Sequence, residues 1–346
     1  MTEVRSRKYF LDLLRIVACF LVIVNHTNSR IFQGSNPEHT VWFVSLTYFF
    51  VSKIAVPVFF MISGYLLLSK VDTWKKAFNR FLRIVIVVVG CSIAYAIYRA
   101  CYVNHNASFS VIMKDALTGY YKSPTNALWY LYAYMGILLM LPLLQKMASV
   151  MTKKDYHVYF AISGCFVSLL PILTHYFPEI KLHSQFQLPL FTAYIGMLMI
   201  GQYFARYEIK KTKLRFVVAV AIFIAMVAFN VIATYFEYQK NSKKYLFFDN
   251  RTFLPIIVQS VCAFYLAMFV ELPAKVGKII SYVGSCTFGI YIVSDMTIGF
   301  LLPEYNKAIA HVHPLFAIVV LEICVFVFGL IAVSILKKVP LVKKVL

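Results

Sequence analysis

The sequence predicts an all-α integral membrane protein, a polytopic transmembrane helical bundle with about ten spans. Of its 346 residues, 61% are hydrophobic and only 14% are charged, whereas soluble proteins are about 45–50% apolar and about 25% charged. The apolar residues fall in runs of about 20, long enough to cross about 30 Å of hydrocarbon. The short alternating segments typical of transmembrane β-barrels are absent.

The predicted spans use nearly the whole chain, so we expect residues 1–346 to form a single integral-membrane domain. The first span lacks a small-residue cleavage site and is interpreted as a retained signal-anchor rather than a removed signal peptide. In order, the spans are expected at 9–31, 43–69, 75–101, 126–147, 157–178, 186–206, 214–237, 252–271, 277–302 and 314–336.

The formal net charge of +20 is explained by membrane topology. When the loops are assigned to alternating sides, about two thirds of the 34 Lys and Arg residues share the side of the N-terminus. The positive-inside rule then places both termini in the cytoplasm. Anionic membrane lipid accounts for the excess of basic residues, so no nucleic-acid site is predicted.

Signals for a metal or a tightly bound cofactor are missing. The seven cysteines show no CxxC or zinc spacing and lie mostly inside the predicted spans, where free Cys usually fills the core. There is no P-loop, HExxH or GxSxG motif. The sequence therefore predicts no metal site and no permanently bound cofactor.

The first span, LDLLRIVACFLVIVNHTNSR, carries three ionisable residues: Asp12, Arg15 and His26. At about 100° per residue, His26 lies about 40° from Asp12 and about 20° from Arg15 around the helix. The three therefore share one stripe, with His26 about 21 Å further along the axis than Asp12. An ion pair and a structural histidine would suffice as an explanation, but intramembrane ionisable residues are functional by default. His26 and Asp12 are the candidate catalytic residues, Asp12 as an orienter of Arg15.

Arg80 and Arg83 lie on one face at the start of the third span, WKKAFNRFLRIV. Guanidinium groups bind phosphate bidentately, so this pair is a candidate site for a polyanionic cofactor. Snorkelling to lipid headgroups is the simpler alternative. It suffices for Lys75 and Lys76, which lie nearer the membrane surface.

Weaker candidates could line a substrate path through the membrane. They comprise one basic residue, several hydroxyl-bearing and aromatic residues, and one acid inside a predicted span. An acid within the membrane usually faces the interior of the bundle or pairs with another group. Interfacial anchoring and helix packing are the alternative explanations. These residues are Lys53, Ser63, Tyr65, Trp129, Tyr130, Tyr291 and Glu322.

Five segments together resemble the membrane acyltransferase-3 family, whose bacterial members O-acetylate cell-surface sugars. They are, in chain order, LDLLRIVACFLVIVNH, VPVFFMISGYLLL, NRFLRI, LWYLYAYMGILLMLPLL and VGSCTFGIYIVSD. They are similar to the family's D-x-L-R…H, FF-x-x-SGYL, R-x-x-R, LW-[FY]-L and S-x-x-x-GIYL motifs. The family's last motif is usually followed by His, but Ser294 and Asp295 stand there in this sequence, so the resemblance assigns that position no role.

The resemblance implies that His26 is the essential membrane histidine and that Arg15, Arg80 and Arg83 belong to the acyl-CoA donor site. It implies a multi-pass protein of the bacterial cytoplasmic membrane that transfers an acetyl group from acetyl-CoA to a polysaccharide or lipid-linked sugar. Many members carry a fused extracytoplasmic hydrolase-like domain. This sequence shows none, so we expect a member that acts alone.

A transporter or flippase for a sugar or lipid is an alternative from another functional class, because inward-facing ionisable residues suit such a path equally well. The sequence lacks the inverted repeats and paired broken helices typical of that class. Acyl transfer to a cytoplasmic or small-molecule acceptor is a second alternative. The oligomeric state is not predicted.

Overall fold

The computed structural model describes residues 8–37, 39–105, 108–241, 246–340 and 342. Over these residues the regular elements are all helices, which confirms the predicted all-α membrane fold. The chain divides into two compact units, and α7 and α13 each pass from one to the other. Unit 1 comprises Met1–Lys70 and Met147–Ser285, and unit 2 comprises Val71–Lys146 and Cys286–Leu346.

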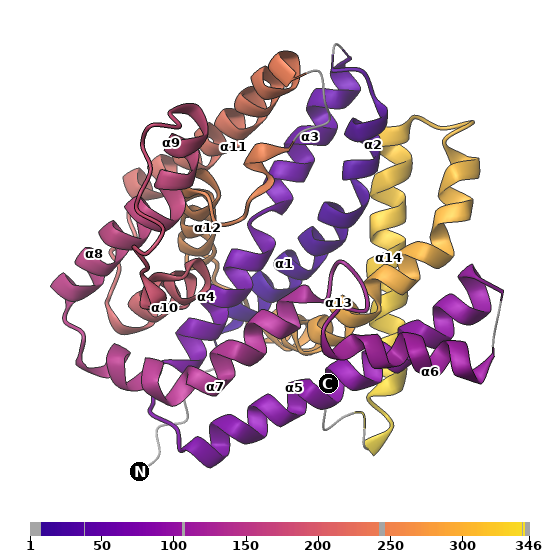
Figure 1. Cartoon of the computed structure of the whole chain (residues 1–346), viewed down its shortest axis with the longest axis horizontal. Helices are drawn as coiled ribbons and strands as arrows, with labels where there is room; N and C mark the ends of the chain where they lie inside the picture. Colours follow the sequence, from indigo (N-terminus) through magenta and orange to yellow (C-terminus); the bar gives the residue numbers. More distant parts are fainter. Residues whose placement is uncertain (1–7, 38, 106–107, 242–245, 341, 343–346) are drawn as a thin grey trace. The chain divides into compact units, whose positions relative to one another are not determined.

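Unit 1 is built around α1 and the helices that pack on it (Figure 1). A cluster of large apolar side chains, including Trp42, Phe50 and Phe248, forms part of its core. Its helices are α1 (Tyr9–Thr27), α2 (Ser29–Gly34), α3 (Thr40–Ser52), α4 (Ala55–Leu67), α8 (Lys153–Ile162), the π-helix η3 (Ser163–Leu169), α9 (Leu170–Tyr176), η4 (Pro189–Phe191), α10 (Ala193–Arg206), α11 (Lys213–Asn241), η5 (Phe247–Asp249), α12 (Leu254–Ala267) and the first part of α13 (Ala274–Ala308).

Unit 2 contains fewer and longer helices. Tyr95 ties two of them together, because its hydroxyl donates to the carbonyl oxygen of Ile292 at 2.8 Å. The helices are α5 (Trp74–Tyr98), which continues as the π-helix η1 (Arg99–Val103), α6 (Phe109–Leu117), η2 (Thr118–Tyr120), α7 (Trp129–Val150), the remainder of α13, and α14 (Pro314–Leu336).

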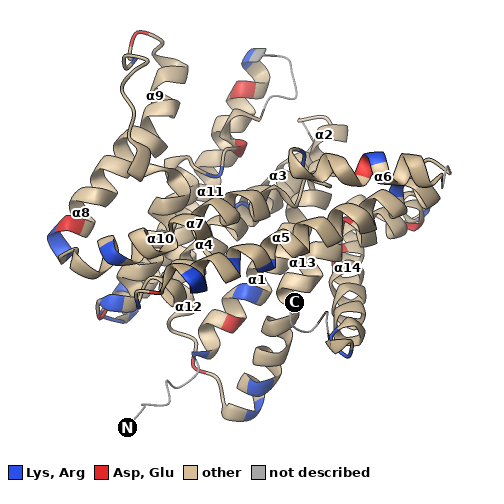
Figure 2. Ribbon diagram, turned by 60° about the horizontal axis from the view of Figure 1, so that its bottom comes forward, with Lys and Arg blue, Asp and Glu red and all other residues tan. Residues whose placement is uncertain are grey.

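Eight helical segments in the described part of the chain are long and apolar enough to cross a membrane. They correspond to eight of the ten predicted spans. The other two appear as α10 and α12, of 14 residues each, or about 21 Å against about 30 Å of hydrocarbon. Figure 2 shows that most of the helix length is uncharged and that charged segments lie mainly near helix ends, as at the beginning of α8. The count of ten and the side of the termini stay predictions.

The second span is interrupted rather than continuous. Helix α3 ends at Ser52 and α4 begins at Ala55. A proline inside a helix clashes with the carbonyl of the residue four positions earlier, and for Pro57 that residue is Lys53. The break falls at this position, so the proline explains both its existence and its place.

Helices α4 and α10 cross at very short range. A Cβ atom added to Gly64 would overlap the backbone carbonyl of Leu198, and one added to Gly201 would overlap that of Met61. Small residues permit such backbone contact in membrane helices. The absence of a side chain at Gly64 and Gly201 therefore permits this close packing, and Tyr65, the next residue of α4, contacts Lys8 and Phe10 at the start of α1.

Candidate functional site

The first turns of α1 hold a buried carboxylate. Asp12 is 3% exposed; its Oδ1 accepts a hydrogen bond from Nη1 of Arg15 at 2.7 Å, and its Oδ2 accepts one from Oγ of Ser281 at 3.0 Å. Helix α13 approaches closely because Gly284 lies over Asp12, where an added Cβ would be 3.0 Å from the aspartate Cβ. The structure thus brings Asp12 and Arg15 together, as the stripe predicts, and adds Ser281 as a partner that the sequence did not reveal.

A second cation, Lys8, directly precedes the first residue of α1. Nζ of Lys8 donates to the hydroxyl of Tyr65 at 2.8 Å, and the ring of Tyr65 packs edge-on against Phe10 at 5.9 Å between centroids. Tyr65 was predicted only as a weak path residue. Its place here joins the SGYL segment of α4 to the polar end of α1.

His26 lies in the last turn of α1 and is half-buried. Its distance from Asp12 along the axis, about 21 Å, follows because α1 is one continuous helix. Several polar groups occupy this end of the helix. Asn28 is buried, and the single Oγ–H of Ser45 lies 3.0 Å from both its backbone oxygen and its Oδ1, a bifurcated hydrogen bond. The Oδ1 atom of Asn25 is buried with no hydrogen-bond partner among the described residues.

Asn25 was missed by the sequence interpretation, although its place directly before His26 was a usable signal. A buried acceptor without a partner is costly. Such an atom is suited to accept a hydrogen bond from a hydroxyl group or from water, although consecutive side chains of a helix point in different directions. The end of α1 therefore combines a titratable ring with an unsatisfied acceptor.

Arg80 in unit 2 is engaged by a carboxylate that the sequence interpretation overlooked. Its guanidinium pairs with Asp72, which also accepts from Nε2 of Gln145 at 3.0 Å and pairs with Nζ of Lys76 at 2.6 Å. Burial alone would raise the pKa of Asp72, but the hydrogen bonds from Lys76, Gln145 and Arg80 lower it to about 2. Arg80 is therefore held in place as a cation beside an ionised carboxylate, and Arg83, one helical turn further on, is exposed.

The aromatic candidates of unit 2 form one cluster. Tyr130 packs edge-on against Tyr291 at 6.2 Å and against Trp129 at 6.4 Å between centroids. The hydroxyl of Tyr291 donates to the carbonyl oxygen of Ala127 at 2.5 Å, so this group anchors the start of α7. Glu322 is 1% exposed on α14.

Lys53 has a structural partner. It is 7% exposed at the break between α3 and α4, pairs with Asp249 of η5, and lies 3.9 Å from the centroid of the Phe49 ring. Ser63 is half-buried on α4. A role for Lys53 in a substrate path stays a prediction, because the ion pair already explains why a cation is tolerated there.

The predicted donor site takes Arg15 from unit 1 and Arg80 and Arg83 from unit 2, and it stays a prediction. The roles predicted for His26 and Asp12 stay predictions as well. Among the described residues, no group of three or more His, Cys, Asp or Glu side chains is arranged to hold a metal ion.

Comparison with known proteins supplies the family. A family model described as an acyltransferase domain matches residues 8–338, nearly the whole chain. No curated protein and no solved structure matches the chain. The matched range includes the α1 stripe, the α5 arginines and the aromatic cluster of unit 2. The chain therefore belongs to the membrane acyltransferase-3 family.

Proposed function

We propose that this membrane acyltransferase moves an acetyl group from cytoplasmic acetyl-CoA to a hydroxyl of a cell-surface or lipid-linked polysaccharide. Family membership supports the acyl transfer. The observation that carries the rest is the polar stripe of α1, with the partly buried Asp12–Arg15 ion pair at one end and His26 about 21 Å away at the other.

Arg15 is the cation that the stripe offers to a donor. Asp12 fixes its orientation through the 2.7 Å bond, while 30% of the arginine side chain stays exposed. Guanidinium groups bind phosphate with good geometry, so Arg15 binds a phosphate of the donor. Arg80 and Arg83 on α5 are proposed to bind donor phosphate as well.

His26 performs the chemistry in this proposal. As a general base, its neutral imidazole takes the proton of the acceptor hydroxyl while that oxygen attacks the thioester carbonyl. The carbon–sulfur bond then breaks, and the departing thiolate receives the proton from the imidazolium. The products are an acetyl ester and free CoA, so atoms and charges balance.

A nucleophilic role for His26 is the second form of the mechanism. The imidazole nitrogen attacks the thioester, and the N–H proton of the ring passes to the departing thiolate, so that CoA leaves as a thiol. The acetyl-imidazole then transfers its acetyl group to the acceptor hydroxyl, whose proton returns to the ring. The two forms differ in one observable: only the nucleophile form releases CoA and labels the protein before any acceptor is added.

The test uses purified protein, radiolabelled acetyl-CoA and membranes that contain the acceptor. We expect His26→Ala to lower CoA release by about 10²–10⁴-fold, the contribution of general acid–base catalysis. The matched control is His39→Ala, because His39 is an exposed histidine at the start of α3 without a side-chain cap bond. Full activity of the His26 variant would remove the catalytic assignment. Substrate flux without thioester turnover would favour a transporter instead.

The acceptor is tested separately by mass analysis of surface glycans from cells with and without the gene. We expect a surface polysaccharide to lose its ester-linked acetyl groups when the gene is absent. If the glycans are unchanged while thioester turnover persists in vitro, the acceptor is a cytoplasmic or small molecule.

A further inference from the structure

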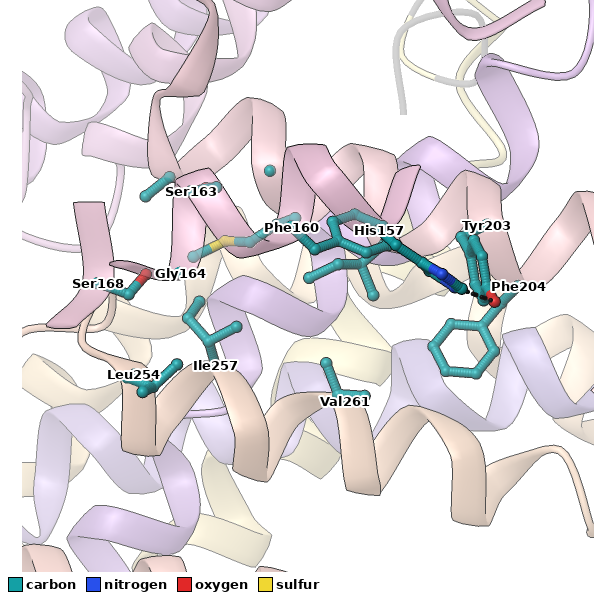
Figure 3. A pocket seen from close by; sticks show the side chains of 14 residues that line it. His157, Phe160, Ser163, Gly164, Ser168, Tyr203, Phe204, Leu254, Ile257 and Val261 are labelled. Carbon is teal, nitrogen blue, oxygen red and sulfur yellow. Dashed lines mark hydrogen bonds between the residues drawn. The ribbon is translucent and has the colours of Figure 1, made fainter. Parts of the chain in front are cut away.

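A cavity of about 330 Å³ lies within unit 1, lined by side chains of α8, η3, α10 and α12. Figure 3 shows His157 and Tyr203 at one end, and Ser168 and Leu254 at the other. Its volume falls in the range of ligand pockets, about 300–1,000 Å³. The π-helix η3 contributes part of the wall, and π-helical turns recur at functional sites.

The cavity is elongated and mostly apolar. Its lining on α10 extends from Ala193 to Phe204, a rise of about 16 Å. The facing wall on α12 presents Leu254, Ile257 and Val261. Water needs two to four polar partners to occupy a cavity, and these two walls offer almost none. Inside a bilayer, the available filling that matches such a lining is a hydrocarbon chain.

One end of the cavity is polar and leads to basic side chains. Nε2 of His157 lies 3.0 Å from the hydroxyl of Tyr203, and the ring of Tyr203 lies 5.0 Å from that of Tyr207. Tyr207 in turn lies under two cations, with Nζ of Lys153 at 5.9 Å and the guanidinium carbon of Arg206 at 5.8 Å from its centroid. The apolar part of the cavity, the His157–Tyr203 pair and the two cations at Tyr207 are thus connected by successive contacts.

The positive charge at this end is in excess. Lys153, Lys154 and Arg206 are all exposed. The neighbouring acid Asp155 is occupied, because its carboxylate accepts from the backbone N–H and the hydroxyl of Thr152 at 2.7 Å each. The chain after α10 adds Glu208 but also Lys210, Lys211, Lys213 and Arg215.

We propose that this cavity holds one acyl chain of an anionic phospholipid, whose phosphate lies against Lys153, Lys154 and Arg206. Selectivity comes from the headgroup, since a hydrocarbon chain gains nothing hydrophobic by moving from lipid into an apolar cavity. The basic end attracts anionic lipid electrostatically. The proposal is independent of acetyl transfer and of the roles assigned to the α1 residues.

The experiment reconstitutes the full chain in phosphatidylcholine vesicles that contain a small fraction of photoactivatable lipid. The probe carries a diazirine in one acyl chain and has either a phosphatidylglycerol or a phosphatidylcholine headgroup. After illumination, peptide mass spectrometry locates the labelled residues. We expect label in η3, α10 and α12, with the phosphatidylglycerol probe exceeding the phosphatidylcholine probe several-fold.

Charge variants test the headgroup. The double variant Lys153→Gln, Lys154→Gln removes two charges, each worth about 1 kcal/mol near an anionic surface, and should bring the ratio of phosphatidylglycerol to phosphatidylcholine labelling close to one. The matched control Lys275→Gln, Lys278→Gln removes two exposed lysines of α13 and should leave it unchanged. Equal labelling by the two probes in the unaltered chain would overturn the proposal, as would equal effects of the two double variants.

A filling variant tests the cavity. A Cβ added to Gly164, which lines the cavity, meets nothing within 4 Å, so Gly164→Leu has room to fold while it occupies the space of the chain. It should lower labelling by both probes several-fold, whereas Gly136→Leu, equally open at its Cβ on α7, should not. Unchanged labelling of Gly164→Leu would overturn the proposal. If that variant fails to fold, the charge variants still decide.

Discussion

Removing the carboxylate of Asp12 should lower the free energy of unfolding, by an amount that can be estimated from the hydrogen bonds this carboxylate accepts. Asp12→Ala deletes the acceptor of two hydrogen bonds, from Arg15 and from Ser281. Ser281 is 7% exposed, so its lost neutral bond costs about 1 kcal/mol. The Arg15 side chain is 30% exposed, so solvent screening keeps its charge-assisted bond near the low end, about 1–1.5 kcal/mol. We expect the free energy of unfolding to fall by about 2–2.5 kcal/mol.

The assay is denaturant unfolding of the purified protein in detergent micelles, followed by far-ultraviolet circular dichroism. Glu271→Ala, which removes an exposed carboxylate just before α13, is the matched control and should stay within about 0.5 kcal/mol of the unaltered chain. A double-mutant cycle of Asp12→Ala with Ser281→Ala should show a coupling of about 1 kcal/mol. Strict additivity in that cycle, or a loss no larger than that of the control, would refute the reasoning.

Three further predictions concern packing, pH and donor binding. Gly64→Ala places a Cβ atom on the backbone of α10 and should cost at least about 1–3 kcal/mol, measured by thermal unfolding, whereas Gly136→Ala should be neutral or slightly stabilising; equal effects would contradict the close crossing. The pKa of Asp72 is about 2 in the folded protein against an ordinary 3.8, so its stabilising contribution is present above the ordinary value and is lost as pH falls through about 2. The stability difference between the unaltered chain and Asp72→Asn should therefore shrink on acidification from about pH 5 to pH 2, and a widening difference would be the wrong sign. Arg83→Ala should weaken acetyl-CoA binding by about 10–100-fold in equilibrium dialysis, with Lys75→Ala as control, and an unchanged affinity would remove Arg83 from the donor site.

The sequence predicted relations within one helix better than relations between helices. Helical periodicity placed Asp12 and Arg15 on one stripe, and the structure confirms their contact. Ser281, 269 residues away from Asp12, carries no local signal of that contact. Gln145, 73 residues from Asp72, is equally invisible to periodicity, because partner choice across a bundle depends on packing rather than on spacing.

The two short helices, α10 and α12, show a different limit of prediction from sequence, which concerns where a helix begins and ends. Hydropathy windows gave α10 and α12 full spans because apolar residues continue beyond their ends. The start of each helix is set by a residue that favours helix initiation. Oγ1 of Thr192 accepts the hydrogen bond of the first turn of α10, and Pro255 stands in the first turn of α12, a position that favours helix starts. Cap chemistry, not mean hydropathy, sets these boundaries.

The contact between Arg15 and Asp12 also bears on how the chain enters the membrane. The first helix is synthesised long before Ser281 exists. A lone Asp or Arg costs about 2.5–3.5 kcal/mol at the centre of an inserting helix and less in the first turns, where Asp12 and Arg15 lie. Because the two residues are three apart on one face, they neutralise each other without help from the rest of the protein. The first helix therefore carries its own counter-ion through insertion, and Asp12→Ala should impair membrane integration of α1 even when the remaining helices are absent.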